Sequence, residues 1–252
     1  MCSACFFGKD RYRKPQFLIE EMKWLMDLGT KEIRFPFESG FNNHEMAKNL
    51  FNSMIREKIN LKFTCNGRAD RLNPELLKLM KEAGCKAINI GCETADETVM
   101  KNLKKMVTLE MVKNAVSDAK KAGLEVMTYF VFGLPGETKK SIKKTYDFAK
   151  NLGADIVTFG VAIPHPGTEF YNDLKGKKLL KSRNWKEYDP ALIPPYNYPG
   201  LSGNEIYELS KKSYKSYYLN PLFILKRARK IGSMQELISN TKNLAGFLKR
   251  YL

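Results

Sequence analysis

Apolar residues recur with two different spacings along the first part of the chain. In some stretches they return every three or four residues, the period of an amphipathic helix, and each such stretch leads into a short apolar run typical of a strand. The helical stretches are residues 17–28, 43–57, 74–83, 109–122 and 141–152, and the strand-like runs are residues 32–37, 60–65, 87–90, 125–132 and 155–162. This alternation predicts an α/β fold with a parallel sheet and helices packed on the strands.

Glycine marks most junctions between a predicted helix and the next strand. Gly29, Gly84, Gly123 and Gly153 each follow a helical stretch. Glycine adopts the left-handed conformation that ends many helices, so these positions predict short helix-to-strand loops. The strand-like runs are almost continuously apolar, which predicts burial on both faces. An open doubly wound sheet and a barrel both fit, and both bind ligands at the carboxyl ends of their strands.

Polar, charged and glycine residues gather directly behind the predicted strands. The main ones are Glu38, Asn66, Arg68, Gly91, Glu93, Gly133 and Pro164. Ordinary loop chemistry explains any single glycine or proline, but not carboxylates and an arginine recurring at one edge. We therefore expect a ligand-binding pocket at this edge of the sheet.

Two thiols lie at the start of the chain, where Cys2 and Cys5 are separated by two residues. Such a pair can hold one metal centre, either zinc or an iron of a cluster. The chain has five cysteines in all, an odd number that does not favour a disulfide framework, and reduced thiols indicate a reducing, cytoplasmic compartment. Zinc is the weaker alternative, because it takes four ligands and His44 and His165 are the only histidines.

The remaining cysteines favour structural interpretations. Cys65 and Cys92 lie at the edge where the pocket is expected. Either would serve as a third metal ligand there, but a buried cysteine acting as a small apolar residue is the favoured interpretation. Cys85 begins its strand at the opposite end of the sheet, which indicates a structural role.

The chain is strongly basic, with a formal net charge of +16. From residue 201 onward there are ten Lys or Arg against three Glu and no Asp. The excess indicates affinity for anions such as phosphorylated or carboxylated substrates, nucleic acid or a membrane surface, although a solvated helix face is its commoner origin. No apolar stretch is long enough to predict a membrane span.

The pattern changes near residue 176. Residues 185–200 are rich in proline and tyrosine and predict an irregular crossing segment, and helical stretches follow at residues 204–219, 222–231 and 234–251. We therefore expect two regions, an α/β region over residues 1–175 and a helical extension over residues 176–252.

Several segments together resemble the radical S-adenosylmethionine (SAM) superfamily. Cys2 and Cys5 are similar to the last two cysteines of its C-x3-C-x2-C motif, and the Gly-Leu-Pro-Gly-Glu-Thr run within residues 130–138 is the most specific match. Other strand-end segments of the family are resembled, in order, by residues 33–38, 64–70, 89–94 and 164–171. The tail at residues 217–227 resembles the branch whose members carry an N-terminal cobalamin-binding domain.

The resemblance implies a partial (β/α) TIM-like barrel with a cofactor site at its rim. In the family, three thiolates hold a 4Fe-4S cluster and leave one iron open for SAM, so Cys2 and Cys5 would be metal ligands. The first cluster cysteine, the first strand and any cobalamin domain would lie ahead of this sequence. The chain is therefore expected to be truncated at its start and to bind a cluster poorly by itself.

The resemblance also implies a role for each rim residue. Glu38 would accept hydrogen bonds from the ammonium group of SAM, Arg68 would pair with its carboxylate, and Glu93 would bind the ribose hydroxyls. For Arg68, simple ion pairing with Asp70 or Glu93 is an equal alternative. The rest of the expected cofactor-binding set is Asn66, Gly91, Val131, Gly133, Ile163 and Pro164, of which Val131, Gly133 and Ile163 would flank the adenine.

The activity implied is reductive cleavage of SAM to a 5′-deoxyadenosyl radical, for methyl transfer or rearrangement of a small organic or lipid-like substrate. Cobalamin would be contributed by a domain absent from this chain, and ferredoxin or flavodoxin would donate the electron. Two alternatives stay open. The basic tail with its tyrosines favours an RNA-modifying enzyme of the same superfamily. The abrupt start favours a non-catalytic remnant or one half of a split enzyme.

Overall fold

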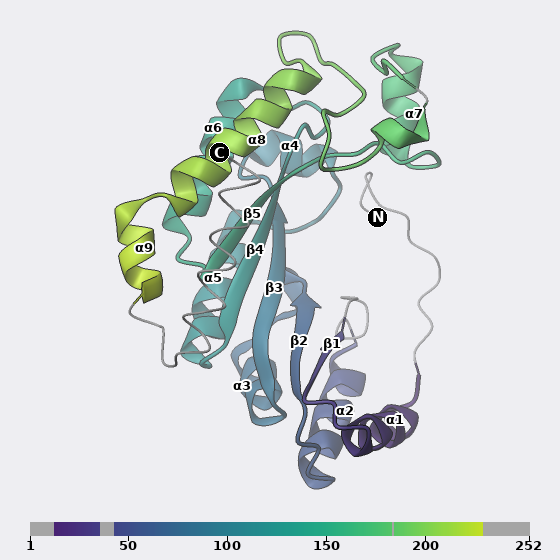
Figure 1. Cartoon of the computed structure of the whole chain (residues 1–252), viewed down its shortest axis with the longest axis vertical. Coiled ribbons are helices and arrows are strands. Elements are labelled where there is room, and N and C mark those ends of the chain that lie inside the picture. Colours follow the sequence, from purple (N-terminus) through teal and green to yellow (C-terminus); the bar gives the residue numbers. More distant parts are fainter. Residues whose placement is uncertain (1–12, 36–42, 183, 229–252) are drawn as a thin grey trace.

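A computed structural model describes residues 13–35, 43–182 and 184–228 (Figure 1). Its centre is a sheet of five parallel strands in the order β1-β2-β3-β4-β5. The strands are β1 (Glu32–Phe35), β2 (Lys62–Gly67), β3 (Cys85–Glu93), β4 (Glu125–Phe132) and β5 (Ile156–Val161). Each predicted strand is therefore present, and β3 extends beyond its predicted ends on both sides.

Each of the five helices predicted ahead of a strand is confirmed. They are α1 (Pro15–Asp27), α2 (His44–Arg56), α3 (Pro74–Glu82), α5 (Leu109–Lys121) and α6 (Lys139–Asn151). Side chains of Asn43, Asn73, Thr108 and Thr138 cap four of them by accepting backbone N–H groups. The four junction glycines all have positive φ, as predicted.

Helical segments that periodicity did not predict are α4 (Glu97–Asn102), α7 (Glu169–Gly176) and the 3-10 turns η2 (Ala69–Arg71) and η3 (Trp185–Glu187). They are short, so few apolar repeats mark them. In the tail, α8 (Gly203–Tyr218) and α9 (Pro221–Ala228) match predicted helices, whereas the helix predicted at residues 234–251 lies outside the described residues.

The strand order decides between the two predicted architectures. Strands follow one another across the sheet without a reversal, and right-handed crossovers then place successive helices on one face. In Figure 1 the helices α3, α5 and α6 lie on that face. A doubly wound sheet needs a reversal of strand order and helices on both faces. The fold is therefore an open, partial barrel instead.

Burial on both faces of the strands is confirmed for residues 88–92 of the central strand β3, but was predicted wrongly for β4 and β5. Along β4 and β5, fully buried residues alternate with half-buried ones. The buried set faces the helices and includes Phe159, whose ring contacts those of Phe130 and Phe132. The other face is concave and half exposed, because the open sheet does not close into a barrel.

The free edge of β5 is covered by α8. The Tyr218 hydroxyl donates to the carbonyl oxygen of Val157 at 2.7 Å and accepts from its N–H at 3.2 Å. The Ser210 hydroxyl donates to the carbonyl oxygen of Phe159 at 2.5 Å. These side chains satisfy edge groups that would otherwise be open for pairing with another strand.

Among the helices that the structure describes, none is both long and apolar enough to cross a membrane.

Candidate functional site

The structure gathers most of the predicted residues at the carboxyl ends of the strands. Asn66 is in β2 and Arg68 follows it, Gly91 and Glu93 end β3, and Gly133 follows β4. Ile163 and Pro164 come just after β5 and are buried. Cys2, Cys5 and Glu38 lie outside the described residues.

A buried lysine stands between two of these residues. The Nζ atom of Lys105 lies 2.6 Å from Oε1 of Glu93 and 2.8 Å from the carbonyl oxygen of Gly91. The Lys105 side chain is only 7 % exposed, against 25 % for Glu93. A side chain at Gly91 would meet this pair, because an added Cβ would lie 2.6 Å from Glu93 Oε1. Gly91 therefore leaves the space that the ion pair occupies.

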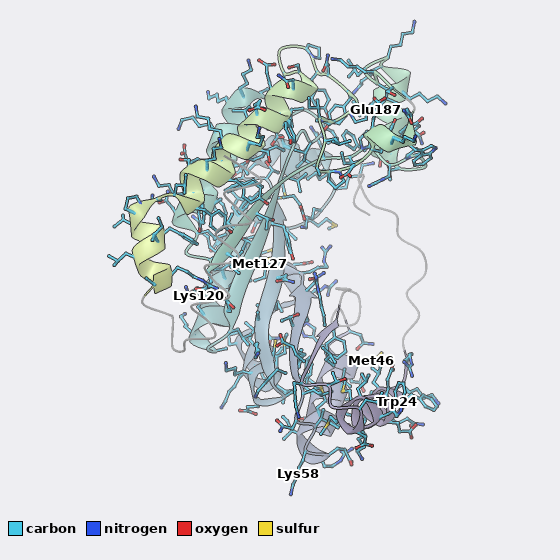
Figure 2. The ribbon with its side chains drawn as sticks, viewed as in Figure 1. Trp24, Met46, Lys58, Lys120, Met127 and Glu187 are labelled. Carbon is cyan, nitrogen blue, oxygen red and sulfur yellow. The ribbon has the colours of Figure 1, made fainter. Side chains whose placement is uncertain are left out.

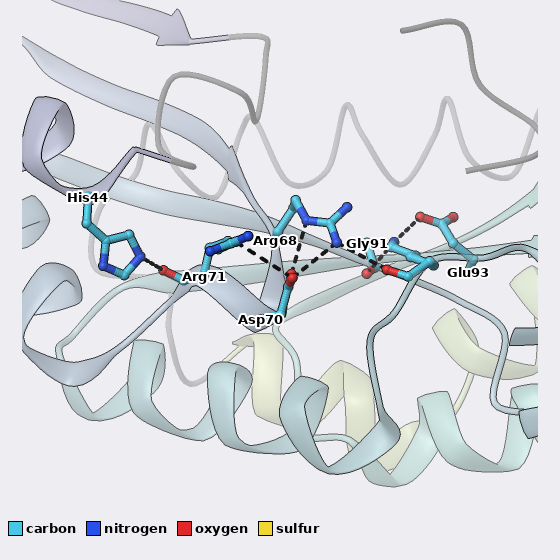
Figure 3. Close-up of polar contacts among 7 residues, drawn as sticks. His44, Arg68, Asp70, Arg71, Gly91 and Glu93 are labelled. Carbon is cyan, nitrogen blue, oxygen red and sulfur yellow. Dashed lines mark hydrogen bonds and ion pairs between the residues drawn. The ribbon is translucent and has the colours of Figure 1, made fainter. Parts of the chain in front are cut away.

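Arg68 is held beside the same lysine by a hydrogen bond to its backbone carbonyl, and Figure 3 shows the guanidinium facing Asp70. Its guanidinium donates to both carboxylate oxygens of Asp70, at 3.0 and 3.2 Å, and to the backbone carbonyl of Lys105 at 3.1 Å. Of the two ion-pair partners weighed for Arg68, the structure shows Asp70, whereas Glu93 pairs with Lys105 instead. Two cations and two carboxylates thus meet at this rim.

Three residues in and next to this cluster have a left-handed backbone conformation. Glu93 has a φ of 70°, and Lys104 and Met106, on either side of Lys105, both have a φ of 55°. Such values are costly for residues other than glycine and persist where the surrounding contacts enforce them. The backbone is therefore strained at the turn that places Lys105 against Glu93.

Asn66 lies one strand away from an amide partner on the concave face. The side-chain amide of Asn89 donates to Oδ1 of Asn66 at 2.9 Å, and the two residues are partners in the β2–β3 register. The pair places amide groups directly below the rim cluster.

The loop after β4 is built around a buried carboxylate. Oε2 of Glu137 accepts the N–H groups of Gly133 and Leu134, at 2.5 and 3.2 Å. Glu137 is 3 % exposed, and its Oε1 has no hydrogen-bond partner among the described residues. Burial raises the pKa of Glu137 to about 8, although the two N–H groups act in the opposite direction.

Two tyrosines from the irregular segment close the same loop. The hydroxyl of the fully buried Tyr196 lies 2.8 Å from the carbonyl oxygen of Gly133 and 3.0 Å from that of Ala162. The Tyr198 hydroxyl also donates to the Gly133 carbonyl, at 3.1 Å. Both polar backbone groups of Gly133 are thus occupied within the protein, and the residue itself is buried against Tyr196 and Ile206. Val131, on the concave face of β4, is half buried nearby.

A cavity of about 970 Å³ opens at this end of the molecule, beside the rim cluster. Its walls come from α4, the turn at residues 135–136, α7 and residues 198–199. None of the predicted cofactor-binding residues lines it. The space therefore belongs to the outer side of the rim.

The described cysteines lie within the apolar core. Cys65, Cys85 and Cys92 are buried, and burial raises the pKa of the Cys92 thiol to about 12. The pKa of Cys65 is also raised, first by a hydrogen bond with Cys85 and then by burial. Their place in the apolar core supports the interpretation of these residues as small apolar groups, which stays a prediction. No cluster of three metal-ligating side chains occurs in the part of the chain that the structure describes.

Sequence reasoning missed Lys105, Glu137 and Tyr196. Lys105 is one of several lysines in a short basic run, and nothing local distinguishes it. Glu137 is within the Gly-Leu-Pro-Gly-Glu-Thr run, so its motif was a usable signal. Tyr196 is in the Pro- and Tyr-rich segment, 63 residues from the glycine that it contacts.

The comparisons with known proteins agree with this geometry. A protein-family model described as "Radical SAM superfamily" matches residues 1–149 of the chain. This range includes the rim residues of β2, β3 and β4. The chain belongs to the radical SAM superfamily.

Relatives and solved structures of this superfamily extend the likeness. The chain is 31% identical over 228 residues to an uncharacterized methyltransferase of Pyrococcus horikoshii, covering 89% of this chain and 50% of that protein. It is 27% identical to a bacteriochlorophyllide d C-12(1)-methyltransferase of Chlorobaculum tepidum, covering 75% and 42%. The chain spans about half the length of the curated relatives it matches or less.

One solved structure has the same fold over most of this chain. It is the radical SAM methyltransferase TsrM from Kitasatospora setae, with cobalamin and a 4Fe-4S cluster bound. The TM-score is 0.66 at 21% identity, over 82% of this chain and 44% of that one. The open five-stranded sheet is thus the partial barrel of the superfamily.

Proposed function

We propose that this chain is the SAM-binding core of a radical SAM methyltransferase that works with a 4Fe-4S cluster and cobalamin. The observation that carries the proposal is the rim cluster, in which Arg68, Lys105 and Glu93 converge at the ends of adjacent strands. The methyltransferase names of two relatives support methyl transfer, and the cobalamin in the TsrM structure supports that cofactor. The substrate would be a small organic or lipid-like molecule.

The polar groups of SAM fit the residues at this rim. A ligand carboxylate needs a cation, and both Arg68 and Lys105 are held here. Ribose hydroxyls need an acceptor, and Glu93 presents one that is a quarter exposed. Asn66 and the Gly91 carbonyl add amide and backbone groups beside them.

Apolar contacts suit the adenine. Val131, Gly133, Ile163 and Pro164 lie on the β4 and β5 side of the rim, and the Gly133 backbone is fixed by Glu137 on one side and tyrosines on the other. Rigid walls lower the cost of ordering a site when a ligand binds. Ile163 and Pro164 are buried, which also excludes water from this side.

When bound together, a reduced 4Fe-4S cluster and SAM supply a radical able to abstract hydrogen from a substrate. The protein residues bind, orient and shield. Cys2 and Cys5 would hold the metal and Glu38 the ammonium group of SAM. An electron donor such as ferredoxin or flavodoxin is part of the proposal.

Anaerobic reconstitution tests this function. The chain is loaded with iron and sulfide, both alone and as a version extended upstream in its gene, and is then incubated with SAM and dithionite. We expect the extended version to give a visible iron–sulfur absorption band and 5′-deoxyadenosine as a product, and the chain alone to give a weaker band. Cys5→Ser should abolish the band, whereas Cys85→Ala, which removes a buried thiol, should retain it.

A binding measurement distinguishes SAM binding at the rim from assembly of the 4Fe-4S cluster. Glu93→Gln should weaken retention of radiolabelled SAM by about tenfold, the effect of removing one charge-assisted contact, and should leave the band unchanged. Glu97→Gln, which removes an exposed carboxylate four positions away, serves as the matched control. Equal SAM retention by both variants, or a reconstituted extended protein that forms neither band nor product, would overturn the proposal.

A further inference from the structure

A cluster of lysines lies around the end of α7, away from the rim cluster. Lys175, Lys178 and Lys181 line a cavity of about 240 Å³ with Leu180 and Ser182. No carboxylate lines this cavity. None of the ion pairs among the described residues involves any of these lysines.

Like charges around one small space indicate an anionic ligand. The three lysines are exposed, and positive charges carried by the residues around one cavity repel one another, a repulsion that a bound anion would relieve. Attraction to the carbonyl end of a helix accounts for Lys175, in the last turn of α7. It does not account for Lys178 and Lys181, which follow the helix. The cavity is smaller than the roughly 300–1,000 Å³ of sites for whole small molecules, so it suits a single phosphate group.

An exposed tryptophan stands beside the lysine cavity. Trp185 is 67 % exposed, and its ring centre lies 5.7 Å from that of Tyr188. The Tyr188 hydroxyl donates to the carbonyl oxygen of Ser182 at 2.9 Å, and Ser182 is part of the cavity wall. The buried Tyr188 thus links the indole to the cavity, while most of the indole surface faces solvent. Exposed aromatic rings next to cationic grooves are the usual platform for stacked bases.

The same segment is attached to the rim of the barrel. Leu180, in the cavity wall, forms an antiparallel bridge with Tyr196, whose hydroxyl contacts the carbonyl of Gly133. Figure 2 shows Glu187, in the η3 turn with Trp185, at the end of the molecule toward which the strands point. Trp24 is at the opposite end. A ligand at the lysine cavity would therefore lie outside the mouth of the barrel.

We propose that Lys175, Lys178 and Lys181 bind a phosphate group and that Trp185 stacks on the attached base, so that this surface binds a nucleotide unit. The unit is either a free nucleotide or part of a single-stranded RNA, since both present a phosphate close to a planar base. The site is independent of the cofactors proposed for the rim, and its test needs none of them.

The tryptophan content of the chain permits an optical test. Trp24 and Trp185 are its two tryptophans, so a Trp24→Phe background leaves Trp185 as the sole indole. Its fluorescence is followed during titration with ADP, with a short oligoadenylate RNA and with inorganic phosphate. We expect saturable quenching by ADP or by the RNA, because a stacked base contacts the indole directly.

Two triple variants separate the site from general charge attraction. Replacing Lys175, Lys178 and Lys181 by Gln should weaken binding by about tenfold or more and lower its salt dependence. The matched control replaces the exposed Lys140, Lys144 and Lys150 of α6 by Gln and removes the same charge. Anisotropy of labelled RNA, or dialysis of ADP, gives the affinities. Trp185→Ala should also weaken binding, by about tenfold.

The ligand arms distinguish the two sources. ADP binding that is lost in the cavity variant identifies a free nucleotide, and binding of RNA alone identifies a strand; each supports the proposal. Equal loss in the α6 variant shows nonspecific attraction and overturns it. Binding of inorganic phosphate with no quenching by either nucleotide ligand, or an unchanged affinity in Trp185→Ala, overturns the stacking role and with it the nucleotide assignment.

Discussion

Glu137 gives the sharpest quantitative prediction, because a buried carboxylate with one oxygen unpartnered among the described residues makes stability depend on pH. Glu137→Gln keeps an amide oxygen that can accept the N–H groups of Gly133 and Leu134, but it cannot ionise. The variant therefore imitates the protonated carboxyl at every pH. The difference in unfolding free energy between wild type and variant isolates the cost of ionising this one group.

The size of the effect follows from the pKa of Glu137, which burial raises from the ordinary value of 4.5 to about 8. Because the folded pKa is the higher one, the folded state binds more protons between these values, and stability falls as pH rises through that window. At about 1.4 kcal/mol for each tenfold change in proton affinity, wild type should lose about 3 kcal/mol relative to Glu137→Gln by about pH 7 and about 5 kcal/mol by about pH 9. Below about pH 4.5 the carboxyl is protonated in both the folded and the unfolded state, so the difference in unfolding free energy between the two proteins should no longer change with pH.

Urea unfolding followed by circular dichroism, repeated from about pH 5 to about pH 9, measures this difference. Glu97→Gln removes one exposed carboxylate and controls for the change in net charge. A wild-type minus Glu137→Gln difference that stays flat across this range would refute the reasoning. A difference that grows in favour of the wild type with rising pH would show that Glu137 is ionised and stabilised in the fold.

Three further predictions concern single contacts. Lys105→Met leaves Glu93 without its cation and should lower SAM retention several-fold, whereas Lys105→Arg should restore part of it; equal binding by both would contradict the role of the charge. Gly133→Ala should cost more stability in thermal unfolding than Gly153→Ala, by about 1–3 kcal/mol. Both glycines have positive φ, but of the two only Gly133 has an atom, the Tyr196 hydroxyl oxygen, in the place of an added Cβ. Equal losses would mean that backbone strain alone, and not this clash, sets the cost. Tyr218→Phe removes the two hydrogen bonds between the Tyr218 hydroxyl and Val157 and should destabilise by about 1–3 kcal/mol, together with faster amide exchange at Val157. Unchanged exchange would show that Tyr218 does not protect this edge.

Local sequence patterns predicted most of the sheet and part of the site. The spacing of apolar residues and the junction glycines predicted the five helix–strand pairs. Such signals are local, because backbone preference and one-sided burial act within a few residues. The placement of Arg68, Gly91 and Glu93 at one edge followed from parallel strand direction alone. The roles expected of Cys2, Cys5 and Glu38 stay predictions, as does the division near residue 175.

The tertiary structure decided what depends on contacts between distant segments. Composition could not distinguish Lys105 from its neighbouring lysines, because its role comes from a strained turn that brings it against Glu93 on another element. Tyr196 closes the Gly133 loop, and α8 covers the free edge of β5, across separations that no periodic pattern records. Whether the sheet was doubly wound or barrel-like also depended on strand order. Apolar periodicity reports which residues are buried, whereas partners and pairing are set by how the chain packs on itself.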